Sequence, residues 1–210
     1  MLVKGGEVAK AEVEALDSRA KVIIAACEMI GEDPSSSLSV RAVAARAGVS
    51  MGSLRHHFPT QRALRDTVLE TIYDVVAADD QLIHDTSVPP RDRLVGCLRQ
   101  ILAAAVGDQA RQAWTKVFDA FIVAEPTAGT RESYLAMDAE GRRRVEHWLT
   151  VLADEGVLRA GDTIQQARFL STVCNGLSIE RALPADDSIL HTETETLYAA
   201  VDAVLAAPDQ

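Results

Sequence analysis

Residues 39–61 read SVRAVAARAGVSMGSLRHHFPTQ, and this stretch decides the fold of the chain. Ala44 is an inward-facing residue of a first short helix, and Gly48 follows its last turn, where a left-handed residue ends a helix at little cost. Ser50 can cap a second helix through its hydroxyl, and Leu54 points back at the first helix. A small residue, a glycine four positions later and an aliphatic residue six positions after that form the spacing of a helix-turn-helix.

Charge is distributed unevenly along the chain. The 210 residues include 21 Lys and Arg against 31 Asp and Glu, for a net charge of −10. Residues 34–65 contain no Asp or Glu but five arginines, which leaves 16 basic and 31 acidic residues elsewhere. These arginines are Arg41, Arg46, Arg55, Arg62 and Arg65. A basic, acid-free segment in an acidic chain is typical of a surface that contacts phosphate, and we expect its arginines to lack carboxylate partners within the protein.

Residues 39–64 resemble the DNA-binding core of TetR-family transcriptional regulators. The resemblance rests on Ser39-Val40-Arg41, on residues 47–50 (AGVS) and on residues 52–64 (GSLRHHFPTQRAL), and at motif level it extends over about the first 80 residues. It implies that the second motif helix enters the major groove of DNA and that the next helix begins just after Phe58-Pro59.

Two positions depart from the family pattern. Arg55 stands where relatives have Tyr and Gln61 where they have Lys, and both positions contact the DNA backbone in relatives. Arg55 can replace a phenol–phosphate hydrogen bond with a charged one. Gln61 keeps a hydrogen bond and loses a charge, but it lies near a helix N-terminus, which itself favours phosphate.

The motif supplies the candidate DNA contacts. The first turn of the recognition helix contains Ser50, Met51, Gly52 and Ser53. Gly52 lets the backbone approach DNA, and Met51 can contact only a thymine methyl group. Arg41 can reach a phosphate or a guanine edge. The candidates for backbone contacts are Ser39, Arg55, His57, Thr60 and Gln61. A metal site at His56 and His57 is disfavoured, because adjacent residues point to different sides of a helix and neither has a partner four positions on.

The rest of the chain predicts helices only. Apolar residues recur at spacings of three and four, and no stretch alternates at period two, so we expect an all-α fold of about nine helices. A flexible N-terminal extension (1–16) precedes a three-helix DNA-binding domain (17–65) and a helical effector-binding and dimerisation domain (66–210).

Several helix ends are predicted from capping residues. Ser39 and Thr60 begin helices in the motif, and Gly31 ends the helix that starts at Asp17. Farther along the chain, Asp108 and Thr130 are the predicted caps of two helices, and Gly156 ends the second of these.

Composition excludes several classes of function. No apolar run is long enough to span a membrane, and the N-terminus lacks the apolar core of a signal peptide. Cys27, Cys97 and Cys174 lie within apolar periodic patterns and suit neither a disulfide framework nor a metal site, so we expect a reducing cytoplasm and three buried thiols. No phosphate-binding loop, nucleophile elbow or paired ligand motif is present, so we expect no catalytic site, metal or cofactor.

A second candidate site lies in the middle helices. Three of the nine aromatic residues, Trp114, Phe118 and Phe121, fall within eight positions on one helical face. Val117 lies at the edge of that face, and Tyr134, Met137 and Trp148 of the next helix can face it. The family resemblance implies an effector pocket among these helices, whereas plain core packing is the alternative for each residue.

The C-terminal part resembles the BetI-like subset of the same family. The residues that carry this resemblance are Trp148-Leu149, residues 154–158 (DEGVL) and residues 175–177 (NGL). It implies a homodimer in which the last two helices form a four-helix interface with their copies. The alternative is that these helices complete the core of a monomer.

The sequence therefore predicts a cytoplasmic, dimeric, ligand-responsive DNA-binding regulator. The resemblance implies a repressor that a small, largely apolar effector releases from a palindromic operator of double-stranded DNA. The alternative is an all-α protein-interaction module, or a small-molecule-binding enzyme that does not bind DNA. A protein-interaction module does not account for the basic segment. An enzyme requires a titratable pair of residues, which the sequence does not offer.

Overall fold

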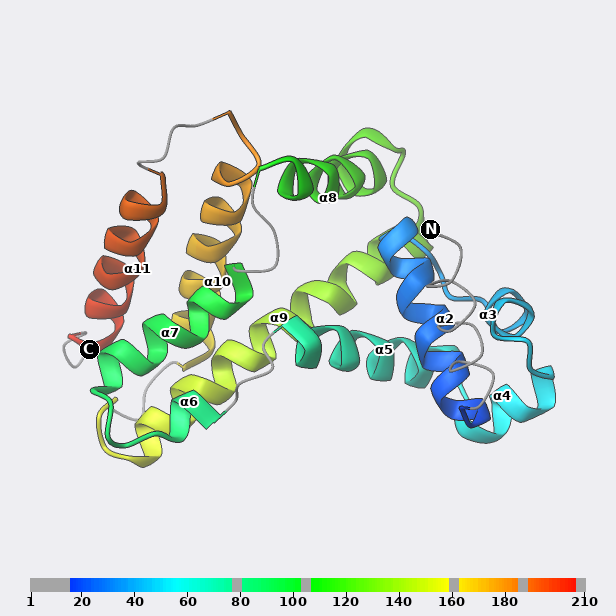
Figure 1. The fold of residues 1–210 in the computed structure, drawn as a ribbon, viewed down its shortest axis with the longest axis horizontal. Helices are drawn as coiled ribbons and strands as arrows, with labels where there is room; N and C mark the ends of the chain where they lie inside the picture. Colours follow the sequence, from blue (N-terminus) through cyan, green and yellow to red (C-terminus); the bar gives the residue numbers. More distant parts are fainter. Residues whose placement is uncertain (1–15, 77–80, 103–106, 159–162, 185–188, 207–210) are drawn as a thin grey trace, which may run out of the picture. The chain divides into compact units, whose positions relative to one another are not determined.

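All regular structure in the described residues is helical (Figure 1). The computed structural model describes residues 16–76, 81–102, 107–158, 163–184 and 189–206, so nearly all of the predicted N-terminal extension lies outside them. The α-helices there are α2 (Ser18–Glu32), α3 (Val40–Ala47), α4 (Met51–His57), α5 (Gln61–Val76), α6 (Gln81–His84), α7 (Pro90–Leu102), α8 (Asp108–Phe118), α9 (Ala128–Asp154), α10 (Thr163–Glu180) and α11 (Ile189–Leu205). A π-helix, η1 (Asp119–Val123), follows α8 directly. The predicted all-α fold is confirmed.

The chain forms two compact units. The first, here the motif unit, comprises Met1–Ile72 and Ala120–Ala136. The second, the bundle unit, comprises Tyr73–Asp119 and Met137–Gln210. The division falls within α5 and within α9, so each of these helices contributes residues to both units.

The core of the motif unit fixes the predicted helix-turn-helix. Helix α2 packs against both α3 and α4 (Figure 1). Ala44 and Leu54 face this core with 2% and 0% of their surfaces exposed. Gly48 has φ 65° and ψ 30°, and its N–H is directed at the carbonyls of Ala44 and Ala45. The small residue, the left-handed corner and the aliphatic anchor therefore act as the spacing predicts.

Side-chain caps begin the helices of this unit as predicted. The Ser39 hydroxyl accepts the Ala42 N–H at 3.3 Å, and the Ser50 hydroxyl accepts the Ser53 N–H at 3.0 Å. The Thr60 hydroxyl likewise accepts a backbone N–H in the first turn of α5. Each cap satisfies a backbone donor that has no partner within its helix.

Three predicted helix ends are wrong. Helix α2 continues through Gly31 and ends at Glu32, because the next residue, Asp33, has an extended backbone (φ −139°, ψ 102°). Helix α9 is capped by Thr127, which accepts the Thr130 N–H at 3.0 Å, so Thr130 lies inside the first turn. Asp108 is already helical in α8, and the residue before it is a glycine without a side chain to cap with. In contrast, Gly156 (φ 74°) follows α9 as expected.

Helices α7, α10 and α11 contact one another around the core of the bundle unit (Figure 1). A buried ion pair joins α11 to the end of α10: Arg181 Nη2 donates to Glu193 Oε1 at 2.8 Å. The same guanidinium donates to the carbonyl of Leu102, the last residue of α7. One arginine therefore ties three segments of the unit together. Among the described helices, none is both long enough and apolar enough to cross a membrane.

None of the three cysteines forms a disulfide. Cys97 and Cys174 are buried as predicted, whereas Cys27 is only half-buried beside the core of the motif unit. Burial raises the pKa of the Cys174 thiol to about 12, and burial also raises the pKa of the Cys27 thiol. Both shifts lower the thiolate fraction at neutral pH, which suits structural rather than reactive cysteines.

Candidate nucleic-acid interface

Helix α4 turns one face to the core and the other to solvent. Leu54 packs inward, while Met51 is 51% exposed and Arg55 and His57 are also exposed. Ser53 is half-buried next to its cap. A short helix held by one aliphatic residue, with an open outer face, can enter the major groove of B-DNA.

Gly52 has no structural reason to be a glycine. It lies in α4 without a positive φ, and a Cβ built there would meet only the Ser50 hydroxyl oxygen, at 3.7 Å. A glycine inside a helix is destabilising by roughly 0.5–1 kcal/mol relative to Ala. The fold therefore has room for a side chain at this exposed position, so packing within the protein does not require a glycine here.

The expectation that the five arginines lack carboxylate partners is wrong for Arg46. Its guanidinium lies 2.5 Å from a Glu32 carboxylate oxygen and 3.3 Å from a Glu28 oxygen. Both carboxylates belong to α2, which precedes the acid-free segment and packs against α3. The arginine therefore braces the motif instead of facing solvent alone.

The same expectation is wrong for two arginines of α5. Arg62 lies 3.6 Å from Asp66, one helical turn on, and remains 85% exposed. Arg65 is buried, with 7% of its side chain exposed, and its Nη1 lies 3.2 Å from Glu132 of α9. Helix packing brings Glu132 to a segment that contains no acid of its own.

Arg41 and Arg55 remain as the sequence predicts. Both side chains are exposed, one on α3 and one on α4, and neither forms an ion pair within the described part of the chain. A guanidinium without an internal counter-charge can form strong paired hydrogen bonds to a phosphate or to a guanine edge. Within residues 34–65, the arginines that form no ion pair in the described structure thus lie on the two helices of the helix-turn-helix.

The other predicted contacts combine a structural role with an available donor. Ser39, Ser50 and Thr60 use a hydroxyl oxygen to accept a backbone N–H, which leaves the hydroxyl hydrogen free to donate to phosphate. The Gln61 amide nitrogen donates to the carbonyl of Ser37 and so joins the start of α5 to the loop before α3. Sequence reasoning missed this internal bond, since its partner is a backbone atom 24 residues away.

The predicted aromatic site is divided between the two units. In the bundle unit, Trp114 and Phe118 of α8 are half-buried with ring centroids 5.8 Å apart. In the motif unit, the rings of Phe121 and Tyr134 pack edge to face with their centroids 5.6 Å apart. Val117 and Met137 are half-buried, whereas Trp148 is fully enclosed in the core of the bundle unit. For Trp148 the alternative of core packing therefore accounts for the residue.

Comparison with known proteins identifies the motif. Residues 22–68 match the family model described as bacterial regulatory proteins, tetR family. No curated protein matches the sequence.

The fold is similar to that of several solved structures. A candidate transcriptional regulator from Pseudomonas aeruginosa PAO1 aligns with TM-score 0.56 and 22% identity over 94% of this chain and 96% of its own. GusR from Salmonella enterica aligns with TM-score 0.55 and 17% identity over 92% of this chain and 98% of its own. A TetR family protein from Vibrio parahaemolyticus aligns with TM-score 0.52 and 18% identity over 88% of this chain and 98% of its own. At these identities the likeness shows the fold alone.

Proposed function

Through residues 22–68 this chain belongs to the TetR family of bacterial regulatory proteins, and we propose that it is a homodimeric repressor that a small, largely apolar effector releases from a palindromic operator. Members of the family are DNA-binding transcriptional regulators and not enzymes. Because operator DNA is the proposed ligand, the proposed site of action is the cytoplasm.

One observation carries the DNA-binding part of the proposal. Helix α4 presents an open face with a glycine in its first turn, and the unpaired arginines of the motif lie on α3 and α4. Arg41 and Arg55 supply phosphate or guanine contacts, and Met51 and Ser53 face base edges. Recognition helices of two subunits would then enter major grooves about 34–36 Å apart, which requires an operator with two-fold symmetry.

The exposed face of α10 supports a second copy of this chain as the dimer partner. Gln165, Phe169, Thr172, Gly176 and Ile179 recur at alternating spacings of four and three, as in a helix–helix seam. Phe169 is 45% exposed, and a Cβ added at Gly176 would meet nothing within 4 Å. In a two-fold interface the same patch meets itself, so the ring of one copy can fill the open space beside the glycine of the other.

The effector part of the proposal rests on the half-buried aromatic residues of α8. Trp114 and Phe118 offer apolar surface that the core does not fully enclose, and Val117 lies between them in the sequence. An effector bound there acts only if it binds more tightly to a conformer in which the two recognition helices no longer match successive grooves.

Selection of DNA from a random duplex pool tests the proposal. We expect the enriched sequences to contain two inverted half-sites, and we expect log affinity to fall by about 0.9 for each phosphate contact per tenfold rise in salt. A pool without enrichment, together with binding that does not respond to salt, would indicate a protein-interaction module instead.

A further inference from the structure

Arg19 is an exposed arginine of the motif unit that lies outside the acid-free segment. It occupies the first turn of α2, and within the described residues it forms no ion pair. Its guanidinium carbon lies 5.7 Å from the centroid of the Phe58 ring. That distance is typical of a cation–π contact, which orients the guanidinium without neutralising its charge.

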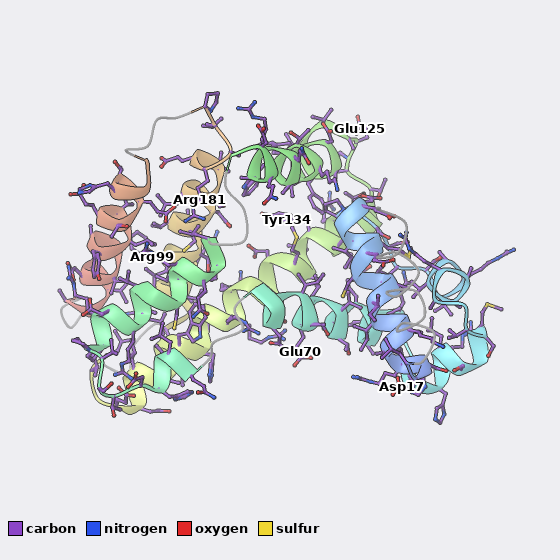
Figure 2. All side chains as sticks on the ribbon, viewed as in Figure 1. Asp17, Glu70, Arg99, Glu125, Tyr134 and Arg181 are labelled. Atoms are coloured by element: carbon purple, nitrogen blue, oxygen red, sulfur yellow. The ribbon has the colours of Figure 1, made fainter. Side chains whose placement is uncertain are left out.

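Phe58 places this arginine beside the recognition helix. The ring is 3% exposed within the core of the motif unit, and Phe58 is the residue that ends α4, immediately after His57. Helix α2 contacts α4, and Figure 2 shows Asp17, at the start of α2, next to α4. A buried ring therefore holds Arg19 at the C-terminal end of the recognition helix.

The charge of Arg19 is poorly matched to its own helix. The N-terminus of a helix carries a partial positive charge, so a cation in the first turn is unfavourable by a few tenths of a kcal/mol to about 1 kcal/mol. The acidic residue closest in sequence, Asp17, already accepts the Ala20 N–H at 2.7 Å as the cap of α2. A bound phosphate would interact favourably with the guanidinium, which forms no ion pair within the described residues.

We propose that Arg19 binds a backbone phosphate of the operator at the edge of the groove that α4 occupies, and that Phe58 positions it there. The proposal rests on the DNA-binding function proposed above. It adds a third unpaired arginine, from α2, to Arg41 of α3 and Arg55 of α4. All three helices of the DNA-binding core then contribute one free guanidinium each.

Substitution of Arg19 gives a distinct signature in a salt titration. We expect Arg19→Ala to weaken binding by the same factor on the selected operator and on a duplex of arbitrary sequence, because a phosphate contact carries no base information. The slope of log affinity against log salt should fall by about 0.9, so the wild-type advantage should shrink about threefold between about 50 and 200 mM salt. Arg19→Lys should restore the slope because it retains the charge.

Controls separate this inference from the function on which it rests. Arg99→Ala removes the same charge from an exposed position of α7 in the bundle unit (Figure 2), and it should leave the slope unchanged. Thermal unfolding of each variant verifies that the motif remains folded. Arg19→Ala with a wild-type slope, whether or not its affinity falls, would overturn the phosphate contact. If wild-type protein itself shows no salt-dependent binding to DNA, the proposed function fails instead.

Discussion

Two arginines of helix α3, five positions apart, differ in whether they form an ion pair within the protein. Arg46 faces α2, where two glutamates hold its guanidinium. Arg41 lies nearer the start of α3, where the described residues offer it no carboxylate. Sequence alone gives both the same charge and the same acid-free surroundings. Only the packing of α2 across α3 separates an arginine that braces the fold from one that is available to a ligand.

Replacement of Arg41 by Ala should therefore weaken operator binding. Loss of a phosphate contact would lower the salt slope by about 0.9, and loss of a guanine contact would weaken operator binding by about 1–3 kcal/mol while sparing arbitrary DNA. Fluorescence anisotropy with both duplexes distinguishes the two. Arg99→Ala again provides the charge-matched control. Unchanged affinity at moderate salt would exclude Arg41 from the interface.

At the scale of elements, the turn between α3 and α4 was predictable because its determinants are local. Ser39, Gly48 and Ser50 each act on backbone within four residues of themselves. The ion pairs of Arg46 and Arg65 were not predictable, since their partners lie on α2 and α9 and are brought close by tertiary packing. The wrong end at Gly31 has a related cause: a glycine permits a helix to end but does not require it to do so.

Gly48 and Gly31 provide a matched pair for testing this distinction. Gly48→Ala should destabilise the protein by about 1 kcal/mol or more, because an L residue is strained at the observed φ of 65°. Gly31→Ala should stabilise it by roughly 0.5–1 kcal/mol, because Gly31 is helical and its Cβ would meet nothing within 4 Å. Urea denaturation measures both, and equal changes of the same sign would contradict the assigned turn.

Gly52→Ala should change stability and DNA binding in opposite directions. A methyl group fits the fold and improves helix propensity, so the free energy of unfolding should rise by roughly 0.5–1 kcal/mol. The same methyl group would block the close approach of DNA and weaken operator binding. A variant that gains stability and binds the operator as wild type does would show that DNA does not approach α4 at Gly52.

At the scale of the whole molecule, the final helices were predicted from periodicity alone. The apolar stripes of α10 and α11 located the core of the bundle unit, with Leu170 and Leu197 fully buried. Periodicity could not show which face of α10 is left uncovered, because that depends on how α7 and α11 pack around it. The exposed Phe169 emerges only from that packing.

Phe169→Arg should convert the proposed dimer to a monomer. A buried, unpaired charge at the centre of a two-fold interface is strongly unfavourable, and the symmetry places two such charges together. Ile164→Arg is the matched control, since Ile164 is also exposed on α10 but lies off the stripe. Sedimentation equilibrium measures the outcome. The proposed interface would be contradicted by a Phe169→Arg protein that remains dimeric. It would also be contradicted by a wild-type protein that is already monomeric.

The link that Arg181 makes to Glu193 and to the Leu102 carbonyl has a consequence for assembly. Removing one member of a buried ion pair leaves the other charge buried and unpaired, so any arrangement of α10 and α11 that separates Arg181 from Glu193 is strongly unfavourable. A subunit would then arrive at its partner with this surface already shaped, and little ordering would remain to oppose association. The rate of dimer association would then be set by the encounter of two preformed surfaces and not by a conformational change on binding.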